Sequence, residues 1–453
     1  MLRCYPAMYR EQRERSSRMA ERKRFAAFFC VIVLLFGIFP APASAEAYTD
    51  AWGYTDEDGD GLILVTVPWE TCTAYMLIVL DPTRVVLGCR PDRLYARGYT
   101  VEEYVKQFDA VAGINAGGFA DEGGNGNGSV PEHAIVSNGE IYCSWSGVGE
   151  GFAGIDADGK LRLGFQHVEE LTQQNIKEGA GYGPILIQDG EPVDPSTSVF
   201  SYWIDTLNPR TAIGQRSDDA ILLLVFDGRQ PSSLGASFAD ETELMLRFGA
   251  VNAANLDGGN SSMMWFDGGY LNNPVGTFDI RPIPTSFVVL KQQRDYTVPD
   301  VSQTERTGMT REEMEALVPD PAAMADNCTE EEKTELEEFA REYIEYYVNF
   351  SADANQMSYL HYYNLLPLTV SGGELQKKLH GAFGSFGYAF VKSVSVLSVK
   401  EDFCTALPDG RYLAGYTYET ESVGRRTVKE EKNIQLTILR QNGKLYVESM
   451  WFY

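Results

Sequence analysis

The sequence predicts an α+β protein whose core is a mixed, largely antiparallel β-sheet with flanking helices, followed by a smaller α+β domain. Three observations support this. Short apolar runs are joined by Asn-Gly and Asp-Gly turns, few segments have helical periodicity, and the composition becomes polar over 292–326. A chain of 453 residues exceeds what one core usually holds. We therefore assign 46–291 to a first domain, 292–326 to a linker and 327–453 to a second domain.

The first 45 residues have the pattern of a secretory signal peptide. A basic stretch precedes the apolar run 25–39, and the small residues "APASA" end at Ala45. A membrane-spanning helix needs about 20 apolar residues, which is more than this run supplies. We expect a secreted or cell-surface protein without a stable membrane span after cleavage; an uncleaved anchor is the alternative.

Charge and cysteine content exclude several classes of protein. The net charge of −26 becomes −31 without residues 1–45, which hold eight basic and three acidic residues. Such an acidic surface repels polyanions, so we expect no nucleic-acid partner. Five cysteines remain and form no CxxC pair, which indicates neither a zinc site nor a disulfide scaffold. Cys72 and Cys89 can pair across neighbouring strands, or both can be free buried thiols.

Strands and hairpins dominate the first domain. The expected strands are 61–67, 74–81, 84–88 and 220–227. The last of these is apolar throughout, as in a strand that is buried on both faces. The expected hairpins have their turns at Asn138-Gly139, at Asp158-Gly159, at Asp189-Gly190 and within 263–271.

Two helices are expected in the first domain. Helix 100–110 begins at Thr100 with Glu103 three residues on, which is a capping box. Helix 240–249 has Asp240 as a possible N-cap and Gly249 as its end.

The second domain begins with a strong helix, 330–350, and continues with alternating strand-like segments. We interpret the apolar and aromatic stripe of this helix as core rather than as a ligand platform; it consists of Leu336, Phe339, Tyr343, Tyr346 and Tyr347. The pattern looks like the cystatin-like or nuclear-transport-factor-like α+β fold.

Four segments each place a polar residue at the end of an apolar strand and beside glycine. They are "GINAGGF" (113–119), "NPRTAIG" (208–214), "VFDGRQPSSLGAS" (225–237) and "NLDGGNSS" (255–262). Glycine permits a close approach of the backbone to a ligand. A single Asp-Gly is ordinarily a turn, and a buried Arg210–Asp227 ion pair is an alternative for that pair. The conjunction of the four segments nevertheless predicts a site on a rigid scaffold.

These motifs, with "CTAYMLIVLDP" and "GPILIQDGE", resemble the phosphodiester glycosidase family over roughly residues 74–290. The resemblance implies the family's fold and a reaction class, the hydrolysis of a sugar-1-phosphodiester to free sugar and a phosphomonoester. Bacterial members are often secreted, which implies a phosphorylated carbohydrate or glycan substrate in exopolysaccharide or cell-envelope processing. The second domain lies outside the resemblance.

Candidate roles follow from the chemistry of this reaction. The phosphate leaves readily because its second pKa is about 6, so an anion clamp and one carboxylate are the main requirements. The catalytic candidates are Asp257, Asp227 as second carboxylate, and Arg210, which shares the clamp with Arg229. The other substrate-binding candidates are Asn115, Gly117, Gly118, Asn255, Gly258, Gly259, Ser261 and Ser262. We expect no cofactor and no metal.

Two other functions remain open. One is non-catalytic binding of a cell-envelope glycopolymer. The other is calcium binding by "DEDGDG" through Asp56, Asp58 and Asp60, which matches the first half of a calcium loop. Position twelve of that loop would be Val67, where a bidentate Glu is needed, so an acidic turn is favoured. No histidine joins a motif, which argues against a Ser-His-Asp hydrolase.

Overall fold

A computed structural model of the chain describes residues 47–453 with several gaps. The gaps are 95, 122–125, 144–146, 202–203, 205, 231–232, 275–279, 292–305, 319, 321–322, 352–362, 384–392 and 424–426. The predicted signal peptide and the first part of the predicted linker lie outside the described residues. Among the described residues, none of the helices combines the length and the apolar character needed to cross a membrane.

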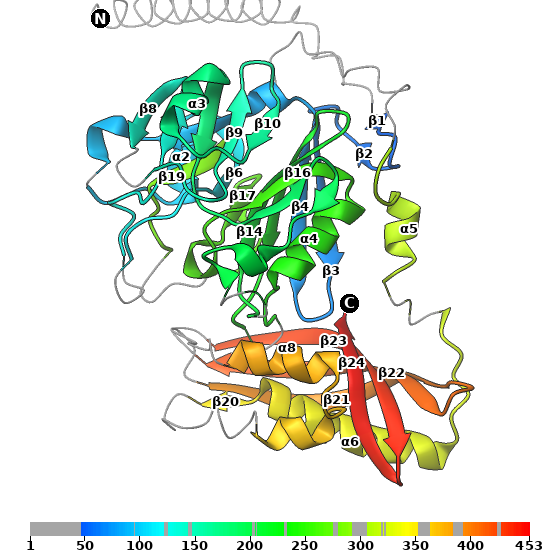
Figure 1. Cartoon of the computed structure of the whole chain (residues 1–453). Helices are drawn as coiled ribbons and strands as arrows, with labels where there is room; N and C mark the ends of the chain where they lie inside the picture. Colours follow the sequence, from blue (N-terminus) through cyan, green and yellow to red (C-terminus); the bar gives the residue numbers. More distant parts are fainter. Residues whose placement is uncertain are drawn as a thin grey trace, which may run out of the picture. The chain divides into compact units, whose positions relative to one another are not determined.

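Three antiparallel sheets build the first domain (Figure 1). The 7-stranded sheet has the order β13 (Glu191–Pro192), β12 (Ile185–Gln188), β16 (Ala250–Asn255), β14 (Arg210–Arg216), β15 (Ile221–Phe226), β4 (Thr73–Val79) and β3 (Leu62–Pro68). One 5-stranded sheet has the order β18 (Gly269–Tyr270), β17 (Met264–Phe266), β6 (Ala110–Asn115), β19 (Thr285–Leu290) and β5 (Val85–Cys89). The other has the order β10 (Leu161–Leu163), β9 (Ala153–Asp156), β11 (Ile176–Ala180), β7 (Ile135–Ser137) and β8 (Glu140–Cys143). The short strands β1 (Tyr48–Thr49) and β2 (Thr55–Asp56) precede them.

All four predicted hairpins are confirmed by their strand pairing, and three of them have the expected conformation at the residue before glycine. Asn138, Asp189 and Asp267 have positive φ values of 52°, 52° and 44°, as expected for the residue before glycine in such turns. Strand β15 is buried along its whole length between β14 and β4, although the sheet is antiparallel. Apolar residues of all three sheets meet in one core cluster, so the first domain has a shared interior.

The helices of the first domain are α2 (Val101–Gln107), α3 (Val168–Gln173) and α4 (Phe238–Arg247). The Thr100 capping box of α2 is confirmed. The predicted N-cap of α4 is wrong, because the helix begins earlier. Ser237 is its N-cap, and Asp240 is the N3 residue that completes the capping box. This shift brings Phe238 and Glu241 into the first turn of the helix, beside Arg210.

The described part of the predicted linker packs on the first domain. It contains the short helix α5 (Arg311–Glu315), which begins with a capping box at Thr310. Trp52 Nε1 donates to Thr307 O at 2.6 Å, and Met309 N donates to Arg247 O at 2.7 Å. Residues 307–314 therefore cover Trp52, which is buried. The division into domains stays a prediction.

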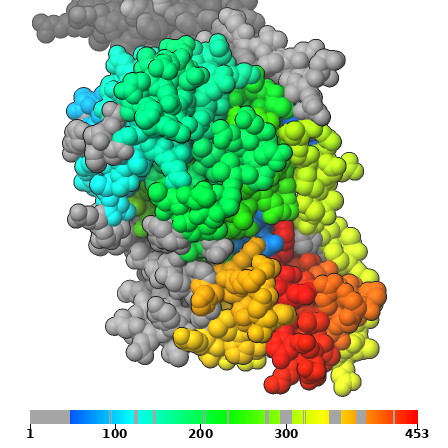
Figure 2. Space-filling view, viewed as in Figure 1, coloured from blue at the N-terminus to red at the C-terminus, as the bar shows by residue number. Residues whose placement is uncertain are grey.

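The second domain is a helix-covered antiparallel sheet. Its strands are β20 (Phe350–Ser351), β21 (Ser393–Ala406), β22 (Arg411–Val423), β23 (Thr427–Gln441) and β24 (Lys444–Phe452), which are hydrogen-bonded in that order. Helix α6 (Glu330–Val348) packs against β21, and α8 (Glu374–Phe383) packs against β24. In Figure 2, α8 is orange and lies beside the red strand β24. Leu336, Tyr343 and Tyr347 of the predicted stripe are buried in this core, which confirms their interpretation.

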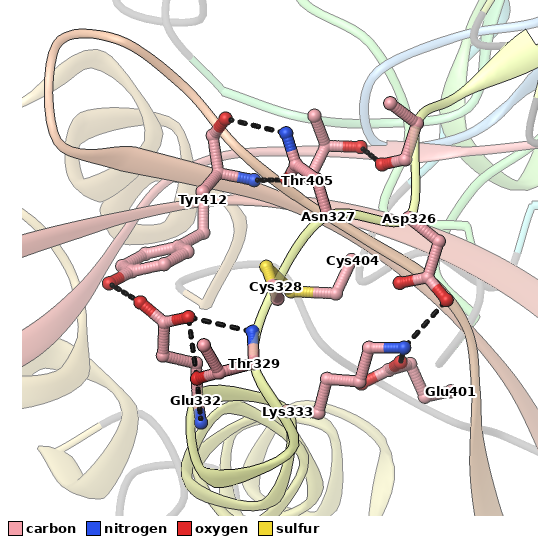
Figure 3. The surroundings of a disulfide bond; sticks show 12 residues. Asp326, Asn327, Cys328, Thr329, Glu332, Lys333, Glu401, Cys404, Thr405 and Tyr412 are labelled. Atoms are coloured by element: carbon pink, nitrogen blue, oxygen red, sulfur yellow. Dashed lines mark hydrogen bonds and ion pairs between the residues drawn. A yellow bond between two sulfur atoms is a disulfide. The ribbon is translucent and has the colours of Figure 1, made fainter.

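A disulfide joins Cys328, immediately before α6, to Cys404 on β21 (Figure 3). Hydrogen bonds hold the same junction. Asn327 N donates to Cys404 O at 3.1 Å, and Ala406 N donates to Asn327 Oδ1 at 2.7 Å. The alternative of a Cys72–Cys89 bridge is wrong. Both are free and buried, as is Cys143.

The acidic run at 56–61 begins with a turn contact. Asp56 is buried, and its Oδ2 accepts a hydrogen bond from Gly61 N at 2.8 Å. This contact fits the interpretation as an acidic turn. A calcium ion at these aspartates stays a prediction.

Candidate active site

The antiparallel order of the large sheet brings three of the four motifs together. Strand β14 lies between β15 and β16, with Arg210 opposite Phe226 and Ala212 opposite Asn255. The first residue of β14 therefore lies beside the last residues of its two neighbours. The loops that follow β15 and β16 carry Arg229 and Asp257 to the same edge.

The fourth motif arrives from the neighbouring sheet through Asn115. Its Nδ2 donates to Asp257 O, and its Oδ1 accepts from Thr211 Oγ1 at 2.8 Å and from Met263 N at 3.0 Å. Asp257 N also donates to Ala116 O at 3.0 Å. Asn115 is fully buried by these contacts. Its expected contact with substrate is therefore replaced by a structural role: it fixes the backbone of Asp257.

A cavity of about 560 Å³ opens at this edge. Its charged lining residues are Asp121, Glu132, Arg210, Arg229, Asp257 and Arg281. Its aromatic lining residues are Phe119, Tyr182, Phe200 and Phe238, and the remaining ones are Asn208, Gly258, Gly259 and Asn260. The volume suits a small ligand, and mixed charges on an aromatic wall are typical of a site that binds a polar molecule.

Asp257 is the carboxylate at the end of β16. Burial raises its pKa to about 6, while the Ser261 hydroxyl and the Arg281 guanidinium act to lower it. The Tyr182 hydroxyl is a second hydrogen-bond donor that faces the carboxylate. Asp257 is thus ionised near neutral pH and held in place, as an electrostatic or nucleophilic role requires.

Arg229 is positioned by an unusual backbone. Its φ is 55°, and every other described non-glycine residue with positive φ is Asp or Asn. Its guanidinium donates to Asn260 Oδ1 and, at 2.8 Å, to Asn208 Oδ1. Both acceptors are neutral, and burial together with Arg210 and Arg281 lowers the pKa of Arg229. Strain of this kind is found mainly at functional sites.

Arg210 lies on the ring of Phe238, with 4.0 Å between its Cζ and the ring centroid. Its Nε donates to Ala236 O at 3.0 Å and its Nη2 to Thr206 O at 2.9 Å. Burial lowers the pKa of Arg210, and the neighbouring Glu241 acts in the opposite direction. Burial also raises the pKa of Glu241 to about 8. Arg210 is therefore a fixed cation at the wall of the cavity.

The second predicted carboxylate, Asp227, does not line the cavity. It is buried, and it accepts from Gln230 Nε2 at 2.8 Å and from Asn273 N at 3.3 Å. No ion pair between Asp227 and Arg210 is present among the described residues. The geometry therefore supports neither its catalytic role nor the alternative of a buried pair with Arg210.

Two further polar candidates also lie away from the cavity. Asn255 is buried, and its Nδ2 donates to Gly183 O. Ser262 is buried as well. Ser261 does not line the cavity either, but it contributes through its hydrogen bond to Asp257.

The predicted glycines differ in what a side chain at their position would contact. A Cβ on Gly259, whose φ is 61°, would lie 3.1 Å from Arg229 Nη2, so the guanidinium fills the space expected for substrate. A Cβ on Gly117 would lie 3.2 Å from Ala180 Cβ, in the interior. For Gly258 the nearest atom is Pro209 O at 3.2 Å, and this residue lines the cavity.

Several lining residues were not predicted from the sequence. Tyr182 and Glu132 lie outside the motifs and carry no periodic signal. Arg281 precedes a proline, as Arg210 follows one, and that similarity is the only hint of it in the sequence. Its Nη1 lies 3.4 Å from Ser261 Oγ, and it forms an ion pair with Asp121.

Comparison with known proteins finds relatives of the first domain. Residues 108–290 match the family model described as phosphodiester glycosidase. This segment, which is less than half of the chain, is similar to the phosphodiester glycosidase family. The resemblance drawn from the motifs is thereby confirmed, and the α+β fold class agrees with the structure.

Curated relatives match the phosphodiester glycosidase segment over part of their length. An uncharacterised prophage-derived protein of Bacillus subtilis, YomE, is 32% identical over 204 residues, which are 43% of this chain and 29% of that protein. The bovine N-acetylglucosamine-1-phosphodiester α-N-acetylglucosaminidase is 29% identical over 191 residues, which are 39% of this chain and 35% of that enzyme. The human enzyme is also 29% identical over 191 residues, and the match covers 36% of that enzyme. The chain thus spans about a third of these relatives.

Solved structures are similar at low identity. The catalytic domain of the zebrafish N-acetylglucosamine-1-phosphodiester α-N-acetylglucosaminidase has a TM-score of 0.43 and 20% identity, covering 51% of this chain and 82% of that one. A hypothetical protein from Synechocystis has a TM-score of 0.41 and 15% identity, covering 56% of this chain and 64% of that one.

Proposed function

We propose that the chain is an exported hydrolase that cleaves a sugar-1-phosphodiester at the glycosidic C–O bond and releases a sugar and a phosphomonoester. One observation carries this proposal. Asp257 and Arg229 line the same cavity, and among the described residues Arg229 has only neutral hydrogen-bond partners. A bound phosphate would supply a counter-charge in direct hydrogen-bond contact and could accept two parallel hydrogen bonds from the guanidinium.

The division of labour follows from the charges. Arg229 and Arg210 bind the phosphate, and Asp257 faces the anomeric carbon as positive charge develops there. The departing phosphate has a second pKa of about 6, so it needs less help from an acid than an ordinary alcohol does. The rings of Tyr182 and Phe200, with centroids 5.1 Å apart, offer an apolar surface to the sugar or to its aglycone.

Export has support from both ends of the chain. The signal-like pattern at 1–45 predicts it, and the Cys328–Cys404 disulfide is typical of proteins in oxidising compartments. The substrate would then be extracellular, and we propose a phosphorylated exopolysaccharide or cell-envelope glycan.

The test is an activity screen of the purified full chain on α- and β-linked sugar-1-phosphodiesters, with detection of free sugar and phosphomonoester. We expect turnover of at least one anomer, together with its loss in Asp257→Asn purified in parallel, which controls for contaminating enzymes. Binding of a phosphorylated glycan without any turnover would favour the alternative, a non-catalytic binder. The absence of both binding and turnover would refute both functions.

A further inference from the structure

Glu132 contributes a second carboxylate to the cavity, although no motif contains it. Its segment is anchored to the Gly-Gly-Phe motif by backbone hydrogen bonds. Glu132 N donates to Gly118 O at 3.1 Å, and Phe119 forms a bridge with Pro131. The position of Glu132 is therefore tied to the strand end that also fixes Asp257.

Gly118 lies beside this carboxylate and leaves room for the Tyr182 ring. A Cβ on Gly118 would lie 2.4 Å from the ring of Tyr182 and 3.4 Å from Glu132 Oε2. Glycine is required here because the Tyr182 ring approaches the backbone closely, and the Glu132 carboxylate lies beside that ring at ordinary contact distance. Tyr182 also carries the hydroxyl that faces Asp257. The two carboxylates consequently share one neighbour inside one cavity.

The surroundings of the two carboxylates differ in kind. Asp257 faces two hydroxyl donors and a guanidinium. Within the part of the chain that the structure describes, the Glu132 carboxylate has no hydrogen-bond or ion-pair partner, and Arg281 is paired with Asp121 instead. Burial and the charge of Asp121 raise the pKa of Glu132. Two carboxyl groups in contrasting environments are the usual basis for separate catalytic roles.

We infer that Glu132 is the general base of the reaction, so that this catalytic residue accepts the proton of the attacking water while Asp257 stabilises the anomeric cation. This inference rests on the proposed function. The water oxygen forms a bond to the anomeric carbon, and the bond from that carbon to the phosphate oxygen breaks. The electron pair leaves with the phosphomonoester. One proton of the water passes to Glu132, which later releases it to solvent.

The test compares the parent chain with Glu132→Gln on the substrate found in the screen. A positioned base contributes about 10²–10⁴-fold, so kcat should fall by that factor while KM stays within about threefold. In the parent, Glu132 and Asp257 must both be ionised. The acid limb of a log kcat/KM plot should therefore approach a slope of two and become one in Glu132→Gln.

Two further variants keep the test sharp. Glu132→Ala should regain turnover with sodium azide and form a glycosyl azide, because azide needs no base. Glu140, an exposed carboxyl on β8, is not among the residues that line the cavity. Glu140→Gln is therefore the matched control and should keep the parental kcat. Melting temperatures confirm that each variant is folded.

The outcomes separate the two proposals. If the parent is active and Glu132→Gln keeps kcat within threefold, or keeps a slope of two, the role of Glu132 is refuted and the proposed function stands. A higher KM at unchanged kcat also refutes the role, because it indicates binding alone. If the parent turns over no sugar-1-phosphodiester, both proposals fail together.

Discussion

Asp257→Asn should make the first domain more stable at neutral pH while it removes most of the activity. Burial raises the pKa of Asp257 to about 6 from an ordinary value of 3.8. At 1.36 kcal/mol for each pKa unit, keeping the folded carboxyl ionised costs up to about 3 kcal/mol. Asparagine keeps the shape without the charge. Because it cannot accept from both hydroxyls as a carboxylate does, we expect a net gain of about 1–2 kcal/mol.

The sign of the effect depends on pH. The folded protein holds the proton of Asp257 more tightly than the unfolded chain does, so this carboxyl adds stability below pH 4, and that stability is lost as the pH rises from about 4 to 6. The advantage of Asp257→Asn should therefore be absent at pH 4 and complete above pH 7. At neutral pH, where the parental carboxyl is ionised, the kcat of Asp257→Asn should be about 10²–10³-fold below that of the parent, the usual loss when one electrostatic contact to the transition state is removed.

Asp227→Asn is the matched control for both measurements. Burial also raises the pKa of Asp227 to about 6, but this residue lies outside the cavity lining. The Asp227→Asn protein should gain similar stability and keep the parental kcat. The assay combines thermal melts at pH 4.5 and 7.5 with initial rates on a confirmed substrate. An Asp257→Asn protein that melts lower than the parent at pH 7.5, or that turns over at the parental rate, would refute the reasoning.

Three further predictions concern binding, cross-linking and boundaries. Arg229→Gly removes the guanidinium, and glycine tolerates the φ of 55° at this position. The loss of a charge-assisted contact to phosphate, worth about 1.5–3 kcal/mol, should raise KM about 10–100-fold. An unchanged KM in steady-state kinetics would show that Arg229 does not bind the phosphate. Cys328→Ser removes a disulfide that closes a loop with a sequence separation of 76. By chain entropy this loss should destabilise the second domain by about 4 kcal/mol. Dithiothreitol should lower the melting temperature of the parent by the same amount, and an unchanged melting temperature in either experiment would contradict the prediction. A chain of residues 46–318 should melt several degrees above one of residues 46–295, because residues 307–314 cover Trp52. Both chains should turn over substrate. Equal melting temperatures would show that residues 307–314 do not stabilise the first domain.

The sequence by itself determined the local structure of this protein and the family of its first domain. Asn-Gly and Asp-Gly turns have conformations that their own residues dictate, and the capping box at Thr100 needs only residues three apart. Arg229 and Asp257 were also found, because a polar residue beside glycine after an apolar strand is visible without any partner, and Arg210 was found from its place after Pro209 at the start of an apolar segment.

Only the tertiary structure decided which polar groups face the cavity. Asp227 and Asp257 look alike in sequence, yet one hydrogen bonds inside the loop after β15 and the other lines the cavity. Glu132 and Tyr182 come from segments whose sequence does not indicate a site. Cys328 forms a disulfide with Cys404 at a sequence separation of 76. These pairings depend on how the chain closes its long loops and packs its sheets. Contacts between residues distant in sequence leave no pattern in a single chain that could be read in advance.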